Sequence, residues 1–260
     1  MKVSVITVVR NSANTIEDAI RSVATQDYPD VEHIIVDGAS TDGTLDIIKR
    51  HTATVTKYIS ETDKGLYDAM NKGLGMATGE VIGFLNADDV YVDSRVLSRV
   101  AHAFRQASID ACYADLVYVS PRDPSRVVRY WKSRPYEEGL FEKGWMPAHP
   151  TFFASRAIYE RLGGFDLDFK RQADFELTMR FLAVHKIRSV YIPEIWIRMR
   201  TGGVSNSSLS GIWQGNLEAY RACKKHNLPV TPLFIAKKVL SRLPQFFARP
   251  DVRSGSGMPS

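Results

Sequence analysis

Apolar runs that resemble strands alternate with segments that resemble helices over the first ninety or so residues of this 260-residue chain. The runs are Val3–Val9, Val31–Asp37, Val55–Ser60 and Val81–Leu85. Neighbouring parallel strands need a long crossover connection, which is usually a helix. The alternation therefore predicts an α/β fold with a Rossmann-like, mostly parallel sheet flanked by helices.

The segments between the runs have helical spacing. Residues 16–24 carry apolar side chains at intervals of three and four, and Asn14 and Glu17 are spaced like a capping box at the start. Further helices are expected through Ile47 and Ile48, over 66–74 and over 96–104.

The regular alternation stops near residue 110. Ala111–Val119 and Val127–Trp131 flank a proline-containing turn and are predicted to be antiparallel partners. Residues 144–153 read as an aromatic loop. A helix is expected to end at Gly163-Gly164, another to open near 172, and two short strands to lie on either side of Pro193.

The chain is expected to end in helices over 209–223 and 232–247. The second helix carries Lys237, Lys238 and Arg242 beside apolar residues, so it lies on an anionic membrane or packs against the domain or a partner subunit. We therefore divide the chain into a main domain of residues 1–205, a helical extension over 206–249 and a disordered tail over 250–260.

Composition narrows the classes of protein. The only cysteines, Cys112 and Cys223, lack the spacing of a metal or redox motif, which favours a reduced, cytosolic setting and argues against structural zinc. The amino terminus reads as a strand, and no run reaches the roughly 18 apolar residues of a spanning helix. The net charge of +5 suits an anionic ligand or membrane surface. No nucleic-acid partner is expected.

The run that begins at Val81 stops abruptly at Asn86-Ala87-Asp88-Asp89. Ligands of open α/β sheets collect at the carboxyl ends of the strands. Adjacent carboxylates suit Mg²⁺ or Mn²⁺, which keep several waters and bridge to substrate phosphates. On its own, the same pair would simply end a strand in a solvated turn. The Gly-x-Gly-x-x-Gly fingerprint is missing after the first run, which argues against a hydride-transferring dehydrogenase.

Several stretches taken together resemble glycosyltransferase family 2, whose members have the GT-A fold. The order and spacing of these stretches extend over roughly residues 3 to 200. The matching stretches are Val5–Asn11, Ile35–Thr44, Asp63–Gly73, Ala77–Glu80, Asn86–Asp89 and Gly163–Asp166 followed by Asp174. The resemblance implies a nucleotide-sugar-binding half over 1–110 and a mixed, acceptor-side half over 111–205.

The resemblance also implies a divalent-cation site. Asn86-Ala87-Asp88 occupies the family's Asp-x-Asp element, although asparagine replaces the first aspartate. Asp88 is the expected ligand of Mn²⁺ or Mg²⁺, and Asp89 is a second ligand or an orienting group. The cation would neutralise the diphosphate as it leaves.

Contacts to the nucleotide sugar are assigned by the same resemblance. Arg10 and Lys64 either meet the diphosphate or lie at the surface. Tyr67, Asp68 and Asn71 share a helix face and either line the nucleotide pocket or lock the helix. The full set of implied contacts is Arg10, Asp37, Asp63, Lys64, Asp68, Asn71, Asn86 and Ala87.

The family places its catalytic base in an acidic pair, usually Glu-Asp, at the start of a helix. Here the pair reads Ala173-Asp174, so Asp174 is the implied base. His149 either lines the acceptor or metal site or is a packed loop histidine. Trp145 and Phe152 either stack on a sugar or belong to the core.

The resemblance implies an inverting transfer from a nucleoside-diphosphate sugar of the UDP or GDP type. The acceptor would be a hydroxyl of a saccharide or lipid-linked molecule in cell-surface polysaccharide biosynthesis, in the cytoplasm or at the inner face of the membrane. Gly38, Asn86 and Ala173 replace family acids, which leaves a non-catalytic nucleotide-sugar-binding or scaffold subunit as the alternative. Residues 10–14 lack the glycine- and lysine-rich loop of a nucleotidyltransferase.

Overall fold

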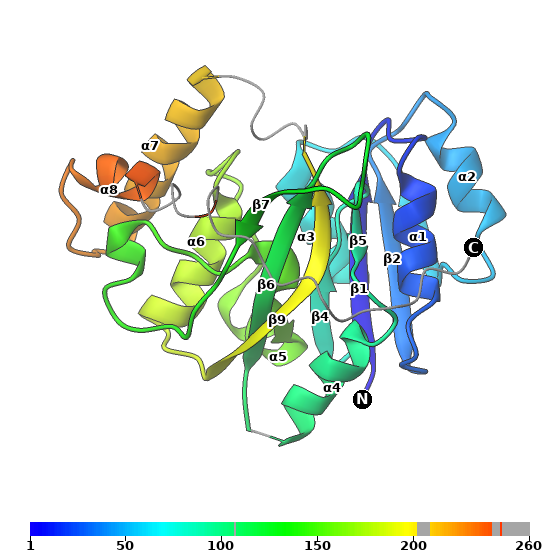
Figure 1. Ribbon diagram of the computed structural model, residues 1–260, viewed down its shortest axis with the longest axis horizontal. Helices are drawn as coiled ribbons and strands as arrows, with labels where there is room; N and C mark the ends of the chain where they lie inside the picture. Colours follow the sequence, from blue (N-terminus) through cyan, green and yellow to red (C-terminus); the bar gives the residue numbers. More distant parts are fainter. Residues whose placement is uncertain (107, 202–208, 241–244, 246–260) are drawn as a thin grey trace.

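The computed structural model describes residues 1–106, 108–201, 209–240 and 245. Within these residues the strands form one mixed sheet in the order β3-β2-β1-β4-β8-β6-β9-β5, and β7 pairs with β6 (Figure 1). Helices α7 and α8 lie at the end of the molecule opposite α1 and α2. The predicted α/β fold with a mostly parallel first half is confirmed.

The first half is the parallel part of the sheet. β2 and β4 pair in parallel with β1, β3 pairs in parallel with β2, and the crossovers between consecutive strands are helical. The strands are β1 (Val3–Val9), β2 (Val31–Asp37), β3 (Lys57–Ser60) and β4 (Val81–Phe84), and the helices are α1 (Ile16–Ala24), α2 (Thr44–Arg50) and α3 (Leu66–Met76).

The second half is mixed, as expected. β6 (Ala111–Val119) runs parallel to β9 (Ser189–Arg200) and antiparallel to β7 (Val127–Trp131) and β8 (Phe153–Ser155). β5 (Asp89–Tyr91) adds to the far side of β9. The helices are α4 (Val96–Gln106), α5 (Arg156–Leu162), α6 (Ala173–Met179), α7 (Leu209–Lys225) and α8 (Phe234–Leu240), with short turns η1 (Phe141–Lys143), η2 (His149–Thr151) and η3 (Arg180–Val184).

Strand β1 shows why the strands of the first half could be predicted from the sequence. All seven of its residues are buried. Ile6 and Val8 belong to a buried cluster with residues of α3, α5 and α6, whereas Val3 and Val5 belong to a second cluster with residues of α4. A strand covered on both faces needs apolar side chains in both directions, so it appears as a continuous apolar run.

Two local predictions were wrong. Asn14 and Glu17 do not form a capping box, because Thr15 is the N-cap residue and the Glu17 carboxylate binds Arg21 and His51 instead. The third strand begins at Lys57 rather than Val55, whose side chain is nonetheless buried.

The strand pattern of the second half also differs from expectation. Pro193 does not divide β9, because the register with β6 shifts between Tyr113 and Asp115. The resulting bulge takes a proline that cannot donate a ladder hydrogen bond. β5 and β8 were not expected, since each has only three residues and too little pattern to be read.

The described part of the carboxyl-terminal region packs on the domain. The Lys238 side chain of α8 is fully buried, donates to Gln172 Oε1 at 2.6 Å and lies 4.3 Å from the centre of the Phe175 ring. One of the sequence alternatives, packing against the domain, is therefore confirmed for α8. The predicted tail over 250–260 lies outside the described residues. Among the described helices, none is long and apolar enough to cross a membrane.

His33 on β2 links stability to pH. It is fully buried, its Nε2 lies 3.0 Å from Thr7 Oγ1, and burial lowers its pKa from 6.5 to about 3. Between these values the unfolded chain binds a proton that the folded chain does not, so stability falls as pH drops below 6.5. We expect His33 to account for a loss of about 2 kcal/mol in unfolding free energy from pH 7 to pH 5.

Urea unfolding at the two pH values measures this loss, and His33→Gln is expected to lose about 2 kcal/mol less than the wild type. Equal losses in the two proteins would show that His33 is not the responsible group.

Candidate active site

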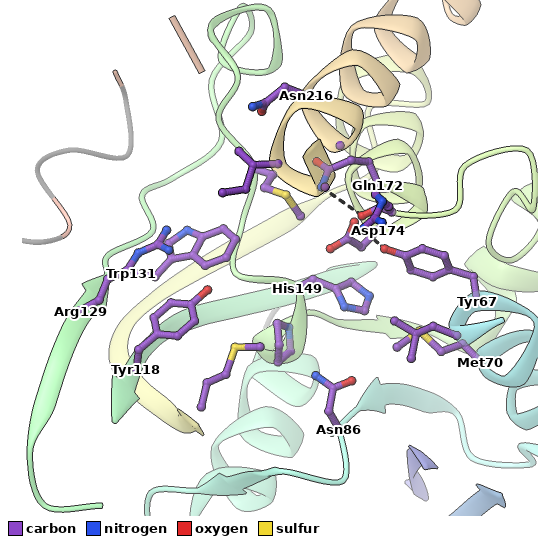
Figure 2. Close-up of a pocket in the computed structure, with 18 residues that line it drawn as sticks. Tyr67, Met70, Asn86, Tyr118, Arg129, Trp131, His149, Gln172, Asp174 and Asn216 are labelled. Atoms are coloured by element: carbon purple, nitrogen blue, oxygen red, sulfur yellow. Dashed lines mark hydrogen bonds between the residues drawn. The ribbon is translucent and has the colours of Figure 1, made fainter. Parts of the chain in front are cut away.

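A pocket of about 150 Å³ opens beyond the carboxyl end of β4, between α3, α6 and α7. Figure 2 shows His149 near its centre, Asn86 below, Tyr67 on one side and Trp131 on the other. Of the residues assigned from sequence, the pocket brings together Asn86, His149 and Asp174. These three come from segments widely separated in the chain.

Asp174 is held by one carboxylate oxygen. Its Oδ1 accepts hydrogen bonds from the Tyr67 hydroxyl at 3.1 Å and from the Phe175 backbone N–H at 2.8 Å. The loop before it is fixed by Glu218 of α7, which accepts from the backbone N–H groups of Arg171 and Gln172. With Oδ1 occupied, Oδ2 is the oxygen left to act on a ligand in the pocket.

Tyr67 is a permanent donor to Asp174. Burial and the neighbouring Asp174 charge raise the pKa of its hydroxyl well above the usual value, so the proton stays on the tyrosine. The ring stacks on Phe165 with centroids 5.4 Å apart. Helix α3 of the parallel half thus orients a carboxylate in the mixed half.

His149 belongs to the pocket and is also well packed. Its ring stacks on Phe84 at 5.7 Å and meets Phe165 edge-on at 5.5 Å. Its Nε2 is buried, and no described residue hydrogen-bonds to it. Burial lowers the pKa of the imidazole, against the opposing Asp174 charge, which favours a neutral ring at neutral pH. A neutral ring with an unpartnered nitrogen can hydrogen-bond to a ligand.

The Asn86–Asp89 stretch folds as a tight turn into β5. The Asp89 backbone N–H donates to the Asn86 carbonyl at 3.1 Å, and the Asn86 amide donates to Asp89 Oδ2 at 2.9 Å. Asp89 is fully buried, and its Oδ1 has no hydrogen-bond partner among the described residues. Asp88 is only half-buried and is the more accessible of the two carboxylates.

These residues fit a divalent cation. Burial and the Asp88 charge raise the pKa of Asp89 well above its usual range, and burial raises that of Asp88 despite the positive Arg200. A bound cation would favour the ionised form of both and give the orphaned Asp89 oxygen a compensating charge. The described residues contain no cluster of three or more metal-binding side chains. Water and substrate phosphate would therefore supply the other ligands, as Mg²⁺-type ions prefer.

The residues expected to meet the nucleotide lie at the ends of β1 to β3, outside the pocket. Asp37 is buried, and its two oxygens accept hydrogen bonds from the Ser40 backbone N–H in the following loop and from Ser60 Oγ of β3 at 2.6 Å. Asp63 approaches Gly38 so closely that a Cβ at position 38 would lie 2.4 Å from Asp63 Oδ2. The Asp63 carboxylate thus occupies the space that a side chain at 38 would need, with Arg10 beside it.

Asp68 and Asn71 of α3, which were also assigned from the sequence, form hydrogen bonds with backbone groups of neighbouring segments. Asp68 accepts from the Lys64 backbone N–H at 2.9 Å, and the Lys64 side chain is exposed. Asn71 makes two 2.8 Å hydrogen bonds with the Phe165 backbone, which connect α3 to the loop that follows α5. Ala87 is buried in a small apolar cluster with Ile16, which leaves only its backbone for a ligand.

Phe152 and Trp145 take the second of their two sequence alternatives, the core. Phe152 is fully buried in the core and Trp145 packs against it, so neither lines the pocket. The pocket wall is formed instead by Tyr118 of β6 and Trp131 of β7, with Asn216 of α7 nearby. Sequence reasoning missed all three. The one available signal was a polar Asn216 on the apolar face of a predicted helix.

Solved structures show which class of protein this architecture defines. The amino-terminal part of TarS from Staphylococcus aureus, in complex with UDP-GlcNAc, matches with a TM-score of 0.65 and 20% identity over 91% of this chain and 69% of that one. The mannosyltransferase PcManGT from Pyrobaculum calidifontis, in complex with GDP-Man and Mn²⁺, matches with a TM-score of 0.65 and 23% identity over 95% and 73%. The fold is that of the GT-A glycosyltransferases.

Sequence comparison gives the family. The model of glycosyl transferase family 2 matches residues 4–163. A PGL/p-HBAD biosynthesis glycosyltransferase of Mycobacterium tuberculosis is 30% identical over 210 residues, which are 78% of this chain and 79% of the relative. The putative glycosyltransferase EpsE of Bacillus subtilis is 28% identical over 248 residues, or 92% and 88%. The chain belongs to glycosyl transferase family 2.

Proposed function

We propose that this protein is an inverting, metal-dependent glycosyltransferase that moves a sugar from a nucleoside-diphosphate sugar to an acceptor hydroxyl. The observation that carries the proposal is the pocket itself. Asp174, oriented through one oxygen, and Asn86, next to Asp88 and Asp89, line the same cavity of about 150 Å³. A base and a leaving-group site at one cavity are the two requirements of a direct displacement at a sugar carbon.

The proposed reaction follows from these positions. Oδ2 of Asp174 takes the proton of the acceptor hydroxyl. At the same time the hydroxyl oxygen attacks the anomeric carbon from the side opposite the diphosphate. Asp88 would hold a divalent cation, which when bound would supply Lewis-acid stabilisation of the leaving diphosphate. Asp174 is the only carboxylate among the described lining residues. A single carboxylate supports one displacement with inversion, since retention through a covalent intermediate needs a second one.

His149 and the strand ends supply the remaining contacts in this proposal. The unpartnered Nε2 of His149 hydrogen-bonds to the donor sugar or its phosphate. Asp63 and the loop shaped by Asp37 hold the base and ribose, and Arg10 meets the diphosphate. The complexes of TarS with UDP-GlcNAc and of PcManGT with GDP-Man and Mn²⁺ support a UDP- or GDP-type donor and a divalent cation.

We extend the proposal to a saccharide or lipid-linked acceptor in cell-surface polysaccharide or glycolipid biosynthesis, at the cytoplasmic face of the membrane. The PGL/p-HBAD biosynthesis relatives support a biosynthetic acceptor of this kind. Peripheral membrane contact is supported by Leu233, Val239 and Leu240, which are exposed on and beside α8 close to Lys237.

A thermal-shift screen of nucleoside diphosphates and their sugars, with and without Mn²⁺, tests the proposal. At about 100 times its Kd, the preferred donor is expected to raise Tm by roughly 5 °C in a protein of this size. The same donor should then release nucleoside diphosphate when an acceptor is present. Binding without any turnover would favour the non-catalytic subunit, and no binding across the panel would contradict both functions.

A further inference from the structure

Helix α8 carries a lysine that the proposed mechanism does not use and that is buried in spite of its charge. Lys238 is 0% exposed, although Lys237 beside it faces the solvent. A lysine next to a core normally buries its methylene chain and leaves the ammonium group in water. Complete burial removes the hydration of that group, which is costly unless strong contacts replace it. The contacts of the Lys238 ammonium group therefore indicate what the charge does.

Those contacts lie on both sides of Asp174 in the chain. The Lys238 ammonium group donates to Gln172 Oε1 at 2.6 Å and lies 4.3 Å from the centre of the Phe175 ring. Gln172 is the N-cap residue of α6, two positions before Asp174. Phe175 follows Asp174 directly and donates its backbone N–H to the Asp174 carboxylate. Figure 2 shows Gln172 next to Asp174 at the wall of the pocket.

Gln172 is fixed through each of its polar groups. Its Nε2 donates to the Arg171 carbonyl at 3.0 Å, its backbone N–H donates to Glu218 at 3.1 Å, and its carbonyl accepts from the Glu176 N–H at 2.9 Å. Its Oε1 is the atom that accepts from Lys238. Gln172 borders the pocket, but its amide is engaged within the protein, so it holds the start of α6 rather than a ligand.

Helix α8 is seated closely enough to make this contact precise. A Cβ at Gly144 would lie 2.6 Å from the Lys238 Cα, so the turn after η1 touches the backbone of α8. Gly144 has a φ of 81°, a conformation that favours glycine. Phe234, one turn before Lys238, is 1% exposed and meets the Phe175 ring edge-on at 6.3 Å. The position of α8 is therefore fixed against both this turn and α6.

We infer that Lys238 is a positioning residue for sugar transfer, which acts through Gln172 and Phe175 to set the start of α6 and the direction of the Asp174 carboxylate. The inference rests on the proposed function, because it takes Asp174 to be the base. A misplacement of about 1 Å can cost a catalytic group about 100-fold in rate. Loss of the Lys238 contact should therefore slow the chemical step. Donor binding should persist, because the residues proposed to hold the donor lie on other segments.

Donor hydrolysis tests the inference without an identified acceptor, because water then takes the place of the acceptor hydroxyl. The probe is the preferred donor from a panel that includes UDP-GlcNAc and GDP-Man, at saturation with Mn²⁺, and released nucleoside diphosphate is measured. Lys238→Met keeps the side-chain length and removes the ammonium group, whereas Gln172→Leu removes its acceptor and leaves α8 unchanged. Each is expected to lower the hydrolysis rate about tenfold or more and to change the donor Kd by no more than about twofold.

The double variant Lys238→Met/Gln172→Leu separates a positioning role from a loss of stability. If Lys238 acts through Gln172, the double variant should be about as slow as the slower single variant, whereas independent effects would multiply. Lys224→Met is the matched control, because Lys224 is exposed on α7 and its ammonium group lies 5.8 Å from the centre of the Tyr220 ring, away from α6. Its hydrolysis rate should stay within about twofold of the wild type.

Wild-type rates in Lys238→Met and Gln172→Leu, or effects that multiply in the double variant, would overturn the inference. A donor affinity that falls together with the rate would also overturn it, since a general loss of structure would then explain the result. If Lys238→Met does not fold, Gln172→Leu tests the same contact with the same expected loss. Failure of the wild type to bind or hydrolyse any donor of the panel would instead contradict the proposed function, on which the inference depends.

Discussion

Replacing Asp174 with asparagine is expected to lower the kcat of sugar transfer by about 100- to 10,000-fold, the range that a positioned general base contributes. Asparagine keeps the shape of the side chain and an oxygen that can accept from Tyr67 and from the Phe175 N–H, which bind Oδ1 in the wild type. The start of α6 should therefore persist. What the variant loses is a second oxygen able to take the acceptor proton.

Asp168→Asn is the matched control. Asp168 lies in the same loop, its side chain is 78% exposed, and it pairs at 3.3 Å with Lys225. A surface change of this kind should alter kcat by no more than about twofold. Steady-state kinetics with the preferred donor separates the two variants, and donor affinity should match the wild type in both. A transfer rate in Asp174→Asn close to that of the wild type would remove Asp174 from the mechanism.

The fold was predictable where local pattern and burial agree. The seven residues of β1 are all buried, and the amphipathic segments between strands are long enough to show a helical period. The three-residue strands β5 and β8 exist because β9, β4 and β6 supply their partners. A three-residue segment is too short for its sequence to indicate its pairing partners, so this part of the sheet could not be predicted.

The candidate site was predictable in its parts but not in its assembly. Asn86, His149 and Asp174 were each marked by a motif or an unusual position, and the pocket brings them together. The contact between Tyr67 and Asp174 spans 107 positions in the chain, and no local pattern predicts it. The same holds for the two hydrogen bonds between Asn71 and the Phe165 backbone, which span 94 positions.

The structure also shows what surrounds Gly38 and Asn86, two positions where this chain has a neutral residue in place of a family acid. Gly38 leaves room for the Asp63 carboxylate, so an acid reaches that position from another strand end. Asn86 donates to Asp89 Oδ2 and holds the carboxylate that is buried behind Asp88. These contacts argue that the neutral residues rearrange the acidic groups of the site rather than remove its function.

Asp88 and Asp89 are adjacent but differ in what they can offer a cation. Asp88 is half-buried and accessible to a ligand, whereas Asp89 is fully buried and already bonded to Asn86 through one oxygen. A cation that also binds a diphosphate must remain accessible from the solvent side. We therefore expect Asp88 to make the direct contact and Asp89 to contribute its charge from behind.

Asp88→Asn is accordingly expected to weaken the Mn²⁺-dependent binding of the preferred nucleoside diphosphate by about 10- to 100-fold or more. Changes to residues that only support a metal ligand typically cost about 10- to 100-fold in metal affinity, so the loss of a direct ligand should cost at least as much. Titration calorimetry with Mn²⁺ and with EDTA measures this in one protein, and the metal-free affinity serves as the internal control because Asp88 should not affect it. Asp89→Asn should cause a smaller loss. If Asp89→Asn alone abolished the Mn²⁺ effect, the two aspartates would have to exchange roles, and if neither did, the cation would bind elsewhere.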